Sequence, residues 1–309
     1  MGVRPDALVG HSVGELAAAC AGGMLSFADM LSFAAERGRL MGASTSLGMM
    51  VAVRGPTRRT WRPSSRRPRE LAVAAYNGPG RLVLSGSPEA VRQAAEKLSA
   101  CGAAVRTLEV PRAFHSPLME PIAQALADAA RTVEATVAHL PVMSTLTAQW
   151  LPRIDPDHLR EHALRPVVFG RAVDRLLDEG YDTFVELGPQ ESLAGLVRAA
   201  AARRRAGGAD GAAVRCSRFR APPAGGFRDF PDGGAGGARE LLETVGHLWA
   251  RGVRLDREEL DAGCRRVPLP PYPTSGGATG PQARSKDCCT VSSGSQRRRP
   301  RTATADRYW

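Results

Sequence analysis

The chain has 309 residues, 43% of them hydrophobic, which is enough to build a core in one large domain or two smaller ones. Its net charge of +11 comes mostly from arginine runs that are rich in Pro, Gly or Ser and almost free of aromatic residues, which favours solvated loops over nucleic-acid binding. Without a long apolar run, a signal-type N-terminus or metal-like or paired cysteine spacing, the sequence predicts a cytoplasmic globular protein with no membrane span, zinc site or disulfide framework.

The first predicted elements flank Ser12, which stands in the run Gly10-His11-Ser12-Val13-Gly14. A strand-like apolar run, 7–9, precedes it, and a helix-forming run, 15–19, follows. A serine between glycines in this context is typical of a nucleophile elbow, whose strained backbone holds the hydroxyl outward. The helix directs its first amides, including that of Val13, at a developing oxyanion. Ser12 is therefore the candidate nucleophile.

The next elements change from helix to strand. A helix is predicted to begin after Ser26, which forms a near capping box with Asp29, and Arg37 lies on it. From residue 49 the pattern predicts strands over 49–54, 71–77, 81–86 and 103–110, with a helix from Ser87-Pro88 to Gly102 before the last of them. This order predicts a small α+β unit inserted into a larger fold.

His115 lies at a predicted strand-to-helix junction, where a general base at the rim of a sheet would stand. The alternative is a histidine that only caps its own helix, which is predicted to begin at Pro117 and to include Ala130.

Beyond this helix the elements alternate, which predicts a mainly parallel sheet. The predicted elements are a strand over 140–147, a helix over 168–179, a strand over 183–187 and a helix over about 191–204. A flexible loop (205–236), an amphipathic helix (about 238–251), an extended proline segment (267–273) and a stretch of disordered composition (274–306) complete the chain.

Six motifs follow one another along the chain. They are Gly-His-Ser-Val-Gly-Glu (10–15), Arg-Gly-Arg-Leu-Met (37–41), Ala-Ala-Tyr-Asn-Gly-Pro (74–79), Leu-Val-Leu-Ser-Gly (82–86), Ala-Phe-His-Ser-Pro (113–117) and Phe-Val-Glu-Leu-Gly-Pro (184–189). Together they resemble the acyltransferase domain of modular type I polyketide synthases and the related malonyl-CoA:acyl-carrier-protein transacylases. The resemblance covers about 1–54 and 71–200 and resumes around 238–273.

The resemblance implies an α/β fold, in which an α/β-hydrolase-like large subdomain carries an inserted ferredoxin-like α+β small subdomain. The implied boundaries are 1–48 and 113–204 for the large subdomain, 49–112 for the small one, 205–237 for a flexible loop, 238–273 for a post-acyltransferase linker and 274–309 for a disordered tail.

The resemblance also implies the chemistry. Ser12 attacks the thioester of an acyl-CoA, His115 takes its proton, and the phosphopantetheine thiol of an acyl carrier protein then cleaves the acyl-serine. This transfer belongs to polyketide biosynthesis, beside neighbouring synthase domains, and it needs no metal or redox cofactor, nucleic acid or membrane. Arg37 matches the family arginine that binds the free carboxylate of a malonyl-type unit, since a planar guanidinium fits a carboxylate in two places.

The resemblance further suggests which extender is taken. Val13 and Phe114 match residues that accompany malonyl rather than methylmalonyl, Phe114 by filling the space of an α-methyl group, whereas Arg112 stands where the family has a histidine. His162 matches the residue whose main-chain carbonyl steadies the catalytic histidine, where Asn or Gln is usual. No role is expected for His158.

The sequence departs from the family pattern in three places, for which we expect a shifted reading frame or a misplaced gene boundary. The family carries a Gly-Gln-Gly-Ser-Gln-type segment ahead of the elbow that supplies a second oxyanion amide, and the loss of one such donor costs about 10²- to 10³-fold in kcat. The chain begins one strand ahead of Ser12, so we expect an N-terminally truncated domain. Residues 55–70 replace a helix with an Arg, Pro and Ser run, and 274–306 form an extra stretch.

Two alternative functions stay open. An α/β serine hydrolase or thioesterase would share the elbow, although such enzymes place an acid between serine and histidine in chain order and no short segment marks one here. An inactive, truncated acyltransferase fragment would serve only as a docking segment for neighbouring domains.

Overall fold

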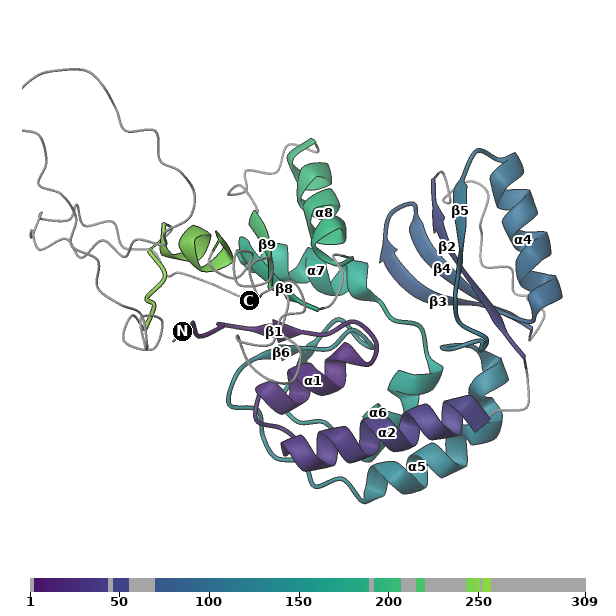
Figure 1. The fold of residues 1–309 in the computed structure, drawn as a ribbon, viewed down its shortest axis with the longest axis horizontal. Coiled ribbons are helices and arrows are strands. Elements are labelled where there is room, and N and C mark those ends of the chain that lie inside the picture. The colour runs from purple at the N-terminus through teal and green to yellow at the C-terminus, as the bar shows by residue number, and fades with distance from the viewer. Residues whose placement is uncertain are drawn as a thin grey trace, which may run out of the picture. The chain divides into compact units, whose positions relative to one another are not determined.

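The computed structural model describes residues 3–43, 47–55, 70–188, 192–206, 215–219, 243–250 and 252–256. The chain divides into two compact units, one holding Pro5–Thr244 with Arg307–Trp309 and the other holding Met1–Arg4 with Val245–Asp306. All elements labelled in Figure 1 belong to the first unit. Residues 243–249 are helical, inside the helix predicted over 238–251. The predicted proline segment and tail lie outside the described residues.

A four-stranded antiparallel sheet forms the small subdomain, at the right of Figure 1. It consists of β2 (Met49–Arg54), β3 (Leu71–Gly78), β4 (Arg81–Gly86) and β5 (Ala104–Leu108), with helix α4 (Pro88–Ala100). The strand order β3-β4-β2-β5, all antiparallel, is that of a ferredoxin-like sheet. Val91 and Leu98 of α4 pack against the sheet residue Leu84. The predicted cap of α4 is confirmed, because the Ser87 hydroxyl accepts a hydrogen bond from the Ala90 amide.

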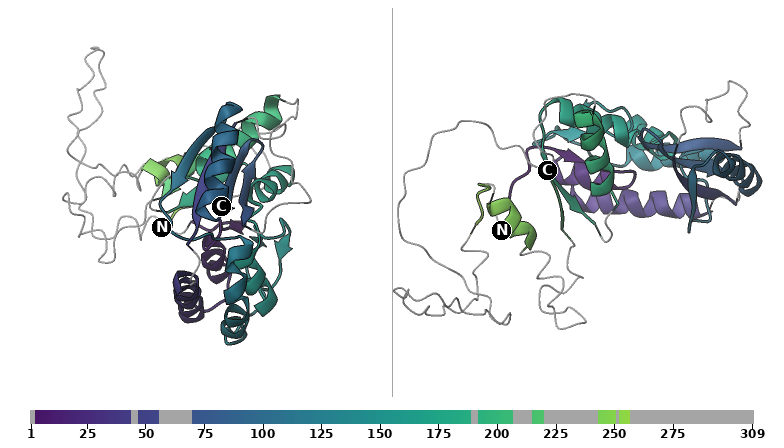
Figure 2. Two further views of the ribbon diagram at one scale, coloured as in Figure 1. Left: turned by 90° about the vertical axis from the view of Figure 1, so that its right-hand side faces the viewer. Right: turned by 90° about the horizontal axis from the view of Figure 1, so that it is seen from above.

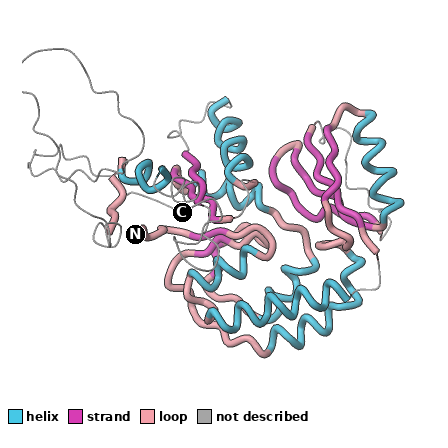
Figure 3. Tube along the Cα trace, in the orientation of Figure 1, coloured by secondary structure: helices cyan, strands magenta, loops and turns pink. Residues whose placement is uncertain are grey.

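The large subdomain surrounds the short strands β1 (Leu8–Val9), β6 (Val142–Met143) and β7 (Trp150–Leu151). Its other elements are α1 (Gly14–Ala21), α2 (Phe27–Ala43), the 3₁₀ helix η1 (Pro117–Ile122), α5 (Ala123–Arg131), α6 (Pro156–Leu164), α7 (Phe169–Asp178), β8 (Thr183–Leu187), α8 (Ala194–Ala206) and β9 (Arg215–Phe219). β1 runs parallel to β6, and β8 runs parallel to β9 in a separate sheet. The prediction of one mainly parallel sheet is therefore wrong in its extent, because the two parallel pairs lie in separate sheets and β7 adds an antiparallel strand to the first. Figure 3 shows the strands in magenta and the helices in cyan.

Helices α1, α2, α5 and α6 lie together and bury the apolar side chains of this half of the fold. Leu16 and Phe33 pack with Val142 and Leu159 in one cluster. The views in Figures 1 and 2 agree that α1 and α2 lie side by side, and the two helices are in contact. No helix in the described ranges is long and apolar enough to cross a lipid bilayer.

Two predicted elements differ from the structure because side chains or proline take over backbone hydrogen bonds. The strand predicted over 140–147 is only Val142–Met143, because the Ser144 hydroxyl accepts from the amides of the next turn and Thr145 N donates to Glu15 instead of a neighbouring strand. The helix predicted to begin at Pro117 starts as the 3₁₀ turn η1 and becomes α-helical only at Ala123, since Pro121 has no N–H to donate.

A third difference lies in the segment predicted as a flexible loop, 205–237. It contains β9, which pairs along its whole length with β8. Cys216 of β9 is half-buried and packs on the core cluster that holds Phe184. The sequence around β9 is rich in Arg and Gly and does not predict a strand. The strand forms because it pairs with β8.

Candidate active site

Ser12 lies in the turn between β1 and α1, in a strained backbone conformation. Its φ is +52°, in the left-handed region that residues other than glycine rarely adopt. Gly10 makes this turn possible, since a Cβ at that position would lie 2.1 Å from the carbonyl carbon of Gly14. A Cβ on Gly14 itself would meet no atom within 4 Å. The strained turn predicted for Ser12 is present, and of its two glycines Gly10 is the one that packing requires.

Ser12 and His115 meet across 103 residues of chain. The Ser12 Oγ lies 2.7 Å from His115 Nε2, and His115 Nδ1 lies 2.9 Å from the main-chain carbonyl oxygen of Arg165. A carbonyl oxygen only accepts, so Nδ1 carries the hydrogen, and Nε2 is left to accept the Ser12 hydroxyl proton. The φ of His115 is +56°, so it too has a left-handed backbone. The arrangement is that of a nucleophile with a neutral base.

The surroundings keep His115 uncharged. Only 5% of the residue is exposed. The pKa of His115 is lowered to about 3, mainly by burial and in part by the charges of the nearby His162 and Arg37, while the hydrogen bond to Arg165 acts in the opposite direction. The imidazole is therefore uncharged at neutral pH, and its Nε2 lone pair is free to accept the Ser12 hydroxyl proton.

The carbonyl that orients His115 belongs to Arg165, and the prediction that His162 supplies it is wrong. His162 lies inside α6, which ends at Leu164, whereas Arg165 is the C-cap residue with an extended backbone (φ −90°, ψ 161°). An extended residue at a helix end turns its carbonyl away from the helix axis, so it can accept from a side chain elsewhere.

Arg37 of α2 is buried near His115, on which its charge acts. It is 6% exposed, and burial lowers the pKa of its guanidinium to about 10. Within the part of the chain that the structure describes, its Nε atom has no hydrogen-bond partner. The charge of Arg37 acts on both His115 and His162. A buried guanidinium whose Nε lacks a partner, close to His115, favours an anionic ligand.

The two residues predicted to choose the extender have different surroundings. Val13 is the N-cap residue of α1 and is 52% exposed. Phe114 is half-buried and packs against the clusters that contain Met41 and Val167. Val13 directly follows Ser12 and Phe114 directly precedes His115, so both residues adjoin the dyad in the sequence.

Sequence reasoning missed a contact between the subdomains. His11 Nε2 lies 2.9 Å from Asn77 Oδ1 at the end of β3, and it donates to that amide oxygen. Val167 adds two main-chain hydrogen bonds to β3, to Ala74 and from Tyr76. His11 and Asn77 both stand in the quoted motifs, and only the fold shows that these motifs meet.

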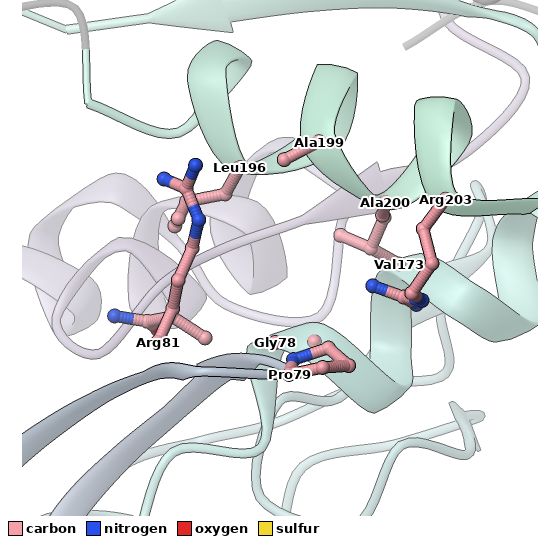
Figure 4. Close-up of a pocket in the computed structure, with 10 residues that line it drawn as sticks. Gly78, Pro79, Arg81, Val173, Leu196, Ala199, Ala200 and Arg203 are labelled. Atoms are coloured by element: carbon pink, nitrogen blue, oxygen red, sulfur yellow. The ribbon is translucent and has the colours of Figure 1, made fainter. Parts of the chain in front are cut away.

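A small pocket lies where the β3–β4 turn faces α7 and α8. Its volume is about 160 Å³. Its lining residues are Asn77, Gly78, Pro79, Arg81, Gly170, Val173, Leu196, Ala199, Ala200 and Arg203. Figure 4 shows the guanidinium groups of Arg81 and Arg203 at separate sides of it. Ser12 and His115 do not line this pocket, whereas its lining residue Asn77 accepts the hydrogen bond from His11, the residue before Ser12.

Comparison with known proteins identifies the family. Residues 1–213 match the family described as acyl transferase domain. The chain belongs to this acyl transferase domain family. It is 36% identical over 279 residues to polyketide synthase GfsA and 39% identical over 275 residues to polyketide synthase GfsB, both of Streptomyces halstedii. Each match covers 88% of the chain but only 3% and 5% of those synthases.

Solved acyltransferase domains share the fold. The acyltransferase domain from the second module of the salinomycin polyketide synthase is 33% identical, with a TM-score of 0.72, and the match covers 86% of this chain and 60% of that one. The acyltransferase domain of SpnD, solved in complex with 2-(pent-4-yn-1-yl)malonyl, is 30% identical with a TM-score of 0.69, covering 82% and 57%. The predicted fold, with a large and a small subdomain, is confirmed.

Proposed function

We propose that this chain is the acyltransferase segment of a polyketide synthase and moves a malonyl-type unit from CoA to the phosphopantetheine thiol of an acyl carrier protein. The observation that carries the proposal is the 2.7 Å contact between Ser12 and a neutral His115, beside the buried guanidinium of Arg37. Among the described residues, Cys20 and Cys101 form no disulfide, which favours the reducing cytoplasm as the compartment of this chain.

The transfer takes two half-reactions on Ser12. In the first, the Ser12 Oγ attacks the thioester carbonyl while its proton passes to His115 Nε2, and the CoA sulfur leaves and takes that proton. In the second, His115 removes the proton of the phosphopantetheine thiol, which attacks the acyl-serine, and the Ser12 oxygen leaves and regains a proton. The Val13 amide, at the start of α1, donates to the oxyanion in both.

Arg37 explains a preference for dicarboxylic acyl groups. Its buried guanidinium lacks a partner for Nε among the described residues, and the free carboxylate of a malonyl unit would supply an acceptor. The malonyl derivative bound to the related SpnD domain supports this class of substrate. Phe114, next to His115, favours malonyl over bulkier extenders because it leaves less room for an α-substituent, and Val13, next to Ser12, matches the branched residue that accompanies malonyl in the family.

The dyad favours acyl transfer over the hydrolase alternative. Serine hydrolases of this architecture orient their histidine with a carboxylate. Here the acceptor for His115 Nδ1 is the main-chain carbonyl of Arg165.

Acylation of the 309-residue chain with radiolabelled malonyl-CoA tests the proposal. Label on Ser12, located by mass spectrometry of peptides, is the expected result, and Ser12→Ala should lose it. Arg37→Ala should lose malonyl at least 10²-fold more than it loses acetyl, as expected from a lost charged contact in a buried site. A folded chain without acyl-serine would instead select the docking fragment, and ester cleavage insensitive to Arg37→Ala would select the hydrolase.

A further inference from the structure

Three buried side chains lie beside the dyad and take no part in the steps above: Glu15, His158 and His162. Glu15 has no exposed surface, and His162 is 3% exposed. The ring of His162 stacks on that of His158, with centroids 6.1 Å apart, and meets the ring of His115 edge-on, at 6.3 Å and 84°. His162 thus contacts the base on one side and the buried cluster on the other.

Glu15 is held as a carboxylate. It accepts hydrogen bonds from Thr145 N (2.6 Å), Thr145 Oγ1 (2.7 Å) and His158 Nε2 (2.7 Å). Burial by itself would raise its pKa, yet these bonds and the neighbouring histidines lower the pKa of Glu15 to about 2. An anion is therefore fixed in the first turn of α1, three residues after the nucleophile.

His162 faces this anion without a full hydrogen bond. Its Nε2 lies 3.7 Å from Glu15 Oε2 and has no hydrogen-bond partner among the described residues. Because a carboxylate only accepts, it favours the tautomer with hydrogen on Nε2. The dipole of the His162 ring then has its positive end toward Glu15.

The titratable groups around His162 are Glu15 from α1, Arg37 from α2, His11 from the elbow, His115 from the segment before η1 and His158 from α6. Glu15 is the one carboxylate in this set. When His115 takes the Ser12 proton, a second positive charge forms near Arg37 in a buried site, which is costly unless an anion offsets it.

We propose that Glu15 and His162 are a positioning pair for the His115 base: Glu15 orients the polar side chain of His162, and that side chain, with the Glu15 carboxylate behind it, keeps the His115 imidazole in place and offsets the charge that it gains. The inference rests on the proposed role of His115. Neither residue touches the reacting atoms.

The test measures the second-order rate constant for phosphonylation of Ser12 by a fluorophosphonate, which needs the dyad but not malonyl transfer. His162→Phe keeps a ring but loses the donor, and His162→Gln keeps a donor that can reach Glu15. We expect His162→Phe and Glu15→Gln each to slow Ser12 about 10-fold or more, part of the 10²- to 10⁴-fold that a positioned base contributes. His162→Gln should stay within about threefold of the wild type on the same scale. His139→Asn, an exposed histidine outside the cluster, is the control.

A double-mutant cycle separates positioning from general damage. The variant with both His162→Phe and Glu15→Gln should be no slower than the worse single variant, since Glu15 acts through His162. Additive losses, or a fast His162→Phe with a slow His162→Gln, would overturn the proposal. So would a wild-type chain that the fluorophosphonate does not modify. Phosphonylation without malonyl transfer would contradict only the proposed function, and circular dichroism identifies any variant that fails to fold.

Discussion

At the scale of single residues, the two glycines that flank Ser12 differ in how much room they have for a side chain. Gly10→Ala would push a Cβ into the backbone of Gly14, so we expect a loss of about 1–3 kcal/mol in the free energy of unfolding, as for other overpacked sites, and little acylation of Ser12. Gly14→Ala, at an uncrowded helix position, should leave both unchanged or slightly improved. Urea unfolding measures the free energy of unfolding of the two variants, and the malonyl-labelling assay measures the acylation of Ser12. Equal losses in the two variants would contradict the packing argument.

Arg37 also affects the pKa of His115. Because its positive charge is one cause of the lowered pKa of His115, Arg37→Met should raise that pKa from about 3 toward the ordinary value of 6.5. Titration of the His115 ring by NMR measures the shift. Arg39→Met is the matched control on the same helix, since Arg39 is exposed and paired with Glu36. A pKa of His115 that stays the same or falls in Arg37→Met would refute the coupling.

Some residues of the candidate site could be predicted from the sequence, and others could not. Ser12 and His115 could be predicted because a strand–turn–helix context and a family motif mark each of them. The Arg165 carbonyl could not, since every residue has one and only the end of α6 determines where it points. Glu15 stood in a quoted motif without an assigned role, because its partners Thr145 and His158 are distant in the sequence.

At the scale of elements, the approach of α7 to the β3–β4 turn fixes the small subdomain beside the elbow. A Cβ on Gly170 would lie 2.7 Å from the amide nitrogen of Gly78, next to Asn77. Gly170→Ala should therefore displace this turn, weaken the bond from His11 to Asn77, and cost about 1–3 kcal/mol in the free energy of unfolding.

The matched control for this change is Gly195→Ala in α8. A Cβ there meets no atom within 4 Å, so alanine should stabilise the helix by up to about 1 kcal/mol. Thermal unfolding compares the two variants, and the rate of Ser12 acylation reports the elbow. If Gly170→Ala instead raises the unfolding temperature, the β3–β4 turn can move to accept the Cβ and the prediction is wrong.

The sequence pattern predicted a helix or strand well where neighbouring residues determine its bounds. β2, β4 and β8 have the predicted bounds, and α4 has its predicted cap. The errors fall where distant partners decide: Glu15 shortens β6 by engaging Thr145, and β8 orders β9. Residues 56–69, inside one of the departures from the family pattern, lie outside the described ranges.

At the scale of the whole molecule, burial of uncharged histidines makes the fold sensitive to acid. The pKa values of His11, His115 and His162 are lowered by burial, to about 3 and about 4 for the last two, from 6.5. Below pH 6.5 the unfolded chain binds more protons than the folded one, so stability falls as the pH drops from about 6.5 to 4. Glu15, whose pKa is lowered from 4.5 to about 2, adds a further loss below pH 4.5.

Unfolding temperatures between pH 7.5 and 4.5 test this expectation. The wild type should lose stability steadily below pH 6.5, and His162→Gln should lose less, because it removes one of the groups that must charge. A melting temperature that is flat or rising from pH 6.5 to 5 would contradict the assignment of neutral buried histidines.

The main-chain origin of the acceptor for His115 has a consequence for how such a chain can vary. The side chain of Arg165 is exposed and pairs with Glu161, while its carbonyl holds the base. Substitutions at position 165 can therefore change the surface charge without removing the carbonyl that accepts from His115. Surface charge and the orientation of the imidazole thus depend on separate atoms of one amino acid.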